Sequence, residues 1–70
     1  METEPGRSVG FVQSFDRAAG YGFVLPVGSH DPVYFRATAL EGIRSVSEGQ
    51  QVSFVLVLGD GRFEATEIRA

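Results

Sequence analysis

Residues 20–24 read Gly20-Tyr21-Gly22-Phe23-Val24, and this alternating segment is the most informative stretch of the chain. In an extended strand successive side chains point to opposite faces, so Tyr21 and Phe23 share one face while Val24 projects from the other. If Val24 points into a core, both rings must point outward. An exposed aromatic pair on a strand is costly unless something covers it, and nucleobases are a suitable cover. The alternative is that the rings only pack together on the sheet surface.

Other extended runs lie on both sides of this segment. Turn formers divide the chain into five runs rich in β-branched and aromatic residues, at residues 9–15, 21–25, 33–35, 51–58 and 62–69. Residues 36–47 are mixed and indicate one helical turn followed by a loop. Asp60-Gly61 between the last two runs is a strong hairpin signal.

The spacing of these runs predicts the fold. Because 70 residues are too few for a sandwich, five short strands predict an all-β, small, five-stranded antiparallel barrel of the oligonucleotide-binding (OB) fold type. The alternation of side chains predicts a core of seven apolar residues, namely Val12, Val24, Val33, Val52, Phe54, Leu56 and Ile68.

Composition narrows the class of protein. The chain has no cysteine, which excludes a disulfide framework and a thiolate metal site and suits the reducing cytoplasm. Residues 1–8 are polar and predict a flexible tail before one domain at residues 9–70, with neither a signal peptide nor a membrane span. The net charge of -3 is unusual for a protein that binds a phosphate backbone.

The ordered series of segments resembles the cold-shock domain family. Residues 10–16 followed by 20–24 look like the start of such a domain, and 20–24 is similar to its first ribonucleoprotein motif. Residues 33–35 resemble the second motif, and the similarity continues in register through residues 42–43, 48–50, 52–54 and 65–68. The resemblance implies a cytoplasmic protein that binds single-stranded DNA or RNA without a cofactor, as an RNA chaperone or a transcription regulator.

The resemblance also implies a binding face on which bases stack on aromatic rings while arginines neutralise phosphates. The residues at matching positions are Phe15, Tyr21, Phe23, Tyr34, Phe35 and Arg44. Arg44 is the preferred phosphate contact because family members tend to be basic there. Three further arginines are weaker candidates for the rim of this face, or are ordinary solvated charges: Arg17, Arg36 and Arg62.

Several positions of that face depart from the family's pattern. The family's tryptophan in the first strand is Ser14 here, and the lysines that flank it are Phe11 and Gln13. Where the family has another lysine, before the second-strand motif, this chain has Ala19. Where the family has the outward phenylalanine of the second motif, this chain has Pro32. Each base stack is worth about 1–3 kcal/mol, so these losses predict weakened binding.

A protein-interaction module on the same fold is the rival hypothesis. Val55 and Val57 are apolar where similar proteins often carry acidic or polar groups, and Phe11 is predicted to point outward from the first strand. Together these residues could form a patch for a protein partner. The acidic charge and the missing tryptophan favour this alternative.

No catalytic or metal site is indicated by the sequence. Ser29-His30-Asp31 contains the residue types of a catalytic triad, but adjacent side chains in a loop diverge and cannot form the relayed hydrogen bonds. His30 is the one histidine and has no cysteine partner, so neither a metal ligand set nor an enzyme is predicted.

Overall fold

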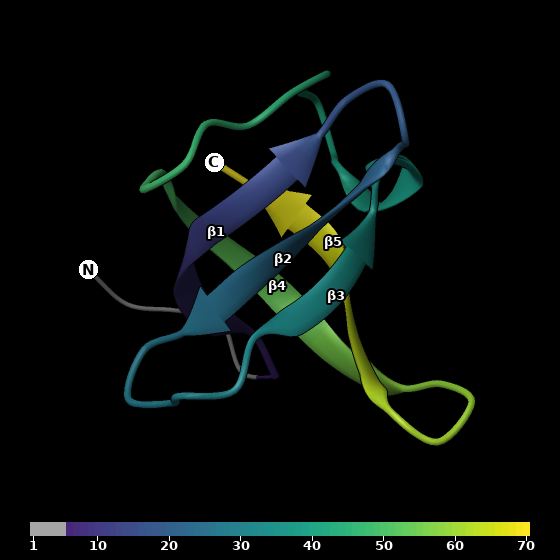
Figure 1. The fold of residues 1–70 in the computed structure, drawn as a ribbon. Helices are drawn as coiled ribbons and strands as arrows, with labels where there is room; N and C mark the ends of the chain where they lie inside the picture. Colours follow the sequence, from purple (N-terminus) through teal and green to yellow (C-terminus); the bar gives the residue numbers. More distant parts are fainter. Residues whose placement is uncertain (1–5) are drawn as a thin grey trace.

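Five strands form where β-branched and aromatic residues gather between turn formers (Figure 1). In the computed structural model, which describes residues 6–70, they are β1 (Ser8–Asp16), β2 (Tyr21–Pro26), β3 (Val33–Arg36), β4 (Gln51–Leu58) and β5 (Phe63–Arg69). One turn of 3-10 helix, η1 (Ala37–Ala39), and a loop connect β3 to β4. The predicted strands agree with these bounds to within one residue at each end.

The strands close into a barrel in the order β1-β2-β3-β5-β4. All neighbouring pairs are antiparallel except β3 and β5, which run parallel with Tyr34 opposite Glu64. The predicted all-β, five-stranded barrel is confirmed, and its one departure from antiparallel pairing is β3–β5. The reason is geometric: strand direction cannot alternate around a closed ring with an odd number of members, so one pair must be parallel.

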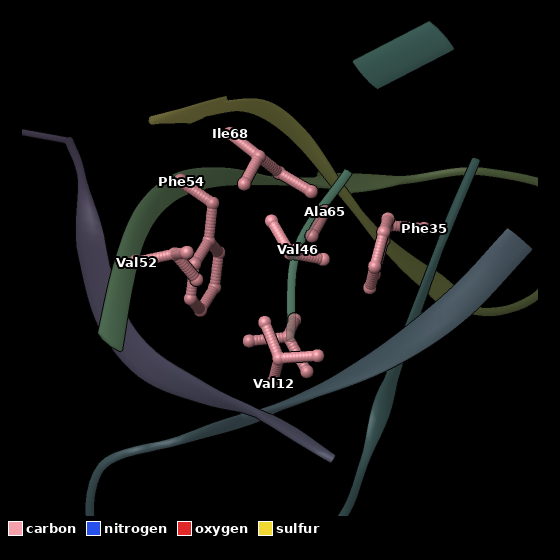
Figure 2. Close-up of a cluster of buried hydrophobic side chains, with 8 residues drawn as sticks. Val12, Phe35, Val46, Val52, Phe54, Ala65 and Ile68 are labelled. Carbon is pink, nitrogen blue, oxygen red and sulfur yellow. The ribbon is translucent and has the colours of Figure 1, made fainter. Parts of the chain in front are cut away.

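The barrel interior holds a small apolar core (Figure 2). Five of the seven predicted core residues are buried, while Val33 and Leu56 are half-buried and pack against them. Three buried residues were not predicted: Phe35, Val46 and Ala65. Val46 lies in the loop before β4, where no alternation signals its burial. The complete buried cluster is Val12, Val24, Phe35, Val46, Val52, Phe54, Ala65 and Ile68.

Glycine at position 22 makes room for this core. Gly22 lies opposite Phe35 in the β2–β3 pair. A Cβ atom at this position would overlap the Ser14 carbonyl oxygen and lie 2.8 Å from Cζ of Phe35. The absence of a side chain therefore lets the Phe35 ring pass over β2 into the barrel.

A β-bulge in β1 decides which way its last residues point. The register with β2 pairs Val12 with Val24 and then Ser14 with Phe23, which leaves Gln13 as the extra residue. Strict alternation from Val12 would turn Ser14 inward. The extra residue reverses this, so Ser14 shares the outer face with Phe23.

The start of the described chain is tied to the barrel. Nη2 of Arg7 donates hydrogen bonds to Ser53 Oγ at 3.0 Å and to the carbonyl oxygen of Glu67 at 2.6 Å. Ser8 already belongs to β1, so the predicted end of the tail at residue 8 is too late. Residues 1–5 of that predicted tail lie outside the described residues. No helix within residues 6–70 is both long and apolar enough to cross a membrane.

Candidate nucleic-acid interface

Three aromatic rings meet on the outer face of β2 and β3. We call Tyr21, Phe23 and Tyr34 the aromatic cluster. Tyr21 and Tyr34 are stacked with ring centroids 5.8 Å apart and planes inclined by 28°. Phe23 presents an edge to each of them, at 6.2 Å from Tyr21 and 6.0 Å from Tyr34. These offset and edge-to-face arrangements are the favoured geometries of aromatic pairs.

The outward direction of the cluster follows from the register. Phe23 is paired with Tyr34 on the face opposite to Val24 and Phe35, which are buried. The rings pack together, as the alternative hypothesis states, yet Tyr21 remains 40% exposed. Phe23 and Tyr34 are half-buried by their neighbours. The cluster is thus a supported surface of aromatic rings outside the core.

Ser14 borders this cluster on the β1 side. It lies opposite Phe23 and is half-buried. At this position the resembling family carries a tryptophan, whose indole would extend the aromatic surface onto β1. A hydroxymethyl group offers no flat ring, so the cluster is confined to β2 and β3.

Two predicted stacking residues belong to the inner side of the barrel instead. Phe35 is 1% exposed and leaves no face for a base, so the prediction that bases stack on it is wrong. Phe35 lies two residues after Val33 in the strand, so its side chain points to the same face. The sequence predicts that Val33 points inward, and Phe35 should therefore point inward as well. Phe15 follows the bulge, packs against the core and stacks on Phe35 with ring centroids 5.6 Å apart. Its ring is half-buried, and the ring pairs of the aromatic cluster do not include it.

The arginines predicted near this face have different surroundings. The guanidinium carbon of Arg62 lies 4.3 Å from the centroid of the Tyr34 ring, a cation–π distance. Arg36 is 3.6 Å from the Glu64 carboxylate, which offsets its charge. Arg44 and Arg17 are exposed. Among residues 6–70, Arg44 has no ion-pair partner within 4.0 Å, so its charge is available to a ligand.

A hollow of about 300 Å³ opens beside Tyr34. Sequence reasoning missed its position because it depends on the parallel β3–β5 pair, which brings Phe63 next to the start of β3. An aromatic residue directly after the predicted hairpin was the available signal. The hollow is lined by Phe23, Asp31, Pro32, Val33, Tyr34, Arg62 and Phe63.

The residues suggested for a protein partner do not form one patch. Phe11 is 44% and Val57 is 42% exposed, whereas Val55 is half-buried. Phe11 lies opposite Gln51 at the start of β4. Val57 lies near the other end of that strand, about 20 Å away at roughly 3.3 Å per residue. Within the described part of the chain, no group of three or more His, Cys, Asp or Glu side chains could hold a metal ion.

Known proteins share this sequence and this fold. The family model described as the "cold-shock" DNA-binding domain matches residues 8–70. The major cold shock protein CspA of Pseudomonas aeruginosa is 41% identical over 64 residues, covering 90% of this chain and 93% of the relative. Cold shock protein CspB of Geobacillus stearothermophilus is 40% identical over 60 residues, covering 84% of this chain and 91% of the relative.

A solved structure of Drosophila Unr, CSD456, has the same fold with a TM-score of 0.74 at 24% identity. The match covers 89% of this chain and 25% of that longer one. The family match extends over nearly all of the described residues, as the resemblance of the ordered motifs predicted. This chain belongs to the cold-shock domain family, a family of nucleic-acid-binding domains rather than of enzymes.

Proposed function

We propose that this protein binds single-stranded DNA or RNA by stacking bases on Tyr21, Phe23 and Tyr34. The observation that carries the proposal is a cluster of three rings that the core does not need. Aromatic surface that is exposed to water is costly, and every base has a π-face that can cover it. Such stacking is tolerant of sequence, because it needs no hydrogen bond to the base edges.

Arginines supply the electrostatic part of the binding. Arg17 and Arg44 are exposed and have no ion pair within residues 6–70, whereas Arg36 is paired with Glu64. Two or three neutralised phosphates give a shallow salt dependence for a single strand. With a net charge of -3 and Ser14 in place of a ring, the affinity is weak.

Weak, sequence-tolerant stacking suits a protein that coats single strands transiently. That behaviour fits an RNA chaperone or a transcription regulator acting in the cytoplasm. The two relatives described above are named cold shock proteins and match over 84–90% of this chain, which supports a related role. The binding is non-covalent and uses no cofactor.

The intrinsic fluorescence of the chain offers a direct test. There is no tryptophan, and both tyrosines, Tyr21 and Tyr34, lie in the aromatic cluster. Titration with oligo-dT and oligo-dA at low salt should change the tyrosine emission saturably, and added salt should reverse it. The double variant Tyr21→Ala/Phe23→Ala, shown to be folded by circular dichroism, is the control and should bind much more weakly, as judged by the anisotropy of a labelled oligonucleotide. If the folded parent protein binds neither oligonucleotide, the proposal is wrong.

The protein-interaction module is the rival outcome of that test. A protein partner could use either exposed residue, Phe11 or Val57, but the barrel separates them rather than joining them. Failure to bind oligonucleotides together with specific capture of a protein from cell extract would favour this alternative.

A further inference from the structure

The hollow beside Tyr34 is a half-open recess walled by aromatic, apolar and charged side chains. It lies between the β2–β3 loop and the β4–β5 hairpin, which leave the same end of the barrel in Figure 1. Its volume of about 300 Å³ is at the lower limit of such sites in proteins. Phe63 in its wall is 57% exposed, so a flat apolar ligand would cover a ring that is otherwise open to water.

Two groups of opposite charge line this hollow without pairing. Arg62 and Asp31 form no ion pair with each other or with any other group in residues 6–70. The Asp31 backbone N–H donates to Ser29 Oγ at 3.1 Å, which orders the loop and leaves the carboxylate exposed. The Arg62 guanidinium is held over the Tyr34 ring. A ring face takes up none of the N–H donors of the guanidinium as conventional hydrogen bonds, so the planar fork remains available.

A guanidinium and a carboxylate that line the same hollow together select one base. Guanine carries two neighbouring acceptors, N7 and O6, which match the arginine fork, and its N2 amino group and N1–H are donors suited to a carboxylate. Adenine and cytosine place an amino donor where the fork needs an acceptor. Thymine offers one acceptor and a methyl group on the corresponding edge.

We propose that the hollow formed by Asp31, Arg62 and Phe63 is a guanine-selective subsite beside the aromatic cluster. This inference rests on the proposed function, because the base reaches the hollow as part of a strand held by the aromatic cluster. Arg62 reads the N7 and O6 edge, Asp31 reads the amino edge, and Phe63 covers a face of the base. A single guanine in a bound strand is therefore recognised, while its neighbours are stacked without selection.

Matched oligonucleotides test the subsite. A heptamer of dT is compared with the same heptamer carrying one central dG, dA, 7-deazaguanine or inosine, with binding followed by the anisotropy of a labelled strand. The dG heptamer should bind about tenfold more tightly than the dT heptamer, within the range for a bidentate contact. Both 7-deazaguanine, which lacks N7, and inosine, which lacks the N2 amino group, should lose most of this gain.

Variants assign the two contacts. Arg62→Lys keeps the charge but lacks the planar fork, so it should abolish the difference between dG and 7-deazaguanine. Asp31→Asn should abolish the difference between dG and inosine. The matched controls lie outside the hollow: Arg69→Lys in the pair with Glu41, and Asp60→Asn in the hairpin turn. Both controls should keep the preference for guanine.

The outcomes separate the subsite from the stacking function. Binding of the dT heptamer with no gain from guanine overturns the subsite and leaves the stacking function intact. A preference for guanine that survives both Arg62→Lys and Asp31→Asn also overturns the assignment. Binding of neither strand by the folded protein overturns both proposals.

Discussion

Tyr34 and Phe35 are adjacent in β3 and carry similar rings, yet they lie on opposite sides of one strand. Phe35 is 1% exposed and fills the barrel above Gly22. Tyr34 lies on the outer face, where it contacts Tyr21, Phe23 and the guanidinium of Arg62. The inner ring packs among apolar side chains and on the Phe15 ring, whereas the outer ring contacts side chains at the surface.

The two faces of β2 and β3 are therefore under different constraints. On the inner face, close packing leaves no freedom for a change of volume. On the outer face, three rings are kept together although the core is complete without them. Rings outside the core fit the proposed surface for bases, and experiments on the two faces should reveal the difference between them.

The largest expected effect is on the inner face. Phe35→Ala should lower the free energy of unfolding by about 3–5 kcal/mol, because it removes a fully buried ring and leaves a cavity. For a 70-residue domain this is a large part of a total of about 5–15 kcal/mol. Urea denaturation followed by circular dichroism measures the loss. Tyr21→Ala is the matched outer-face control and should lose about 1 kcal/mol or less; equal losses in the two variants would contradict the comparison.

The inner face could be predicted only in part, for identifiable reasons. The strands were found because turn formers and β-branched residues mark them. The resemblance to the cold-shock domain family predicts Phe35 on the ligand face, although its alternation with the inward-pointing Val33 indicates the interior. The bulge at Gln13, which turns Phe15 toward the core, leaves no mark in the sequence because any residue can occupy it.

On the outer face, side-chain directions that depend on residues adjacent in sequence could be predicted. Tyr21 and Phe23 point outward as the alternation within β2 predicts. The contact between Arg62 and Tyr34 depends on the parallel pairing of β3 with β5, which brings together residues far apart in the chain. The hollow that includes Asp31 and Phe63 depends on the same pairing, so pattern reasoning along the sequence could not place it.

The next largest effect is expected on binding. Tyr21→Ala and Phe23→Ala should each weaken the binding of oligo-dT by about 1–3 kcal/mol, or roughly 5- to 150-fold, since each removes one platform for a base. Both variants should remain folded, because the core lies on the opposite side of β2. The anisotropy of a labelled oligonucleotide measures the affinity. If both folded variants bind as the parent protein does, the outer face is not a stacking surface.

A gain of function should follow from extending the outer face onto β1. Ser14→Trp places an indole opposite Phe23, where it can pack on the aromatic cluster and offer a further flat surface. Binding should tighten by about 1–2 kcal/mol, toward the lower end of the range for one stacked base, because part of the new ring packs on Phe23. Quenching of the new tryptophan by oligo-dT reports the contact directly. Ser45→Trp, in the exposed loop before β4, is the control and should give no such gain. No gain in the Ser14 variant would mean that bases do not reach the β1 side.

The smallest effect concerns a single charge. If two or three arginines neutralise phosphates, log affinity should fall against log salt concentration with a slope of about -1.4 to -2. Arg44→Ala should make that slope shallower by about 0.7 while changing the affinity at moderate salt only a few-fold. Arg69→Ala is the control, because Arg69 Nε donates to the Glu41 carboxylate at 2.8 Å and belongs to the β4–β5 pair rather than to β2 and β3. Its slope should match that of the parent protein. Equal slopes for all three proteins would show that Arg44 makes no phosphate contact, and a parent slope several units steeper would reveal a basic surface that one copy of the chain does not have.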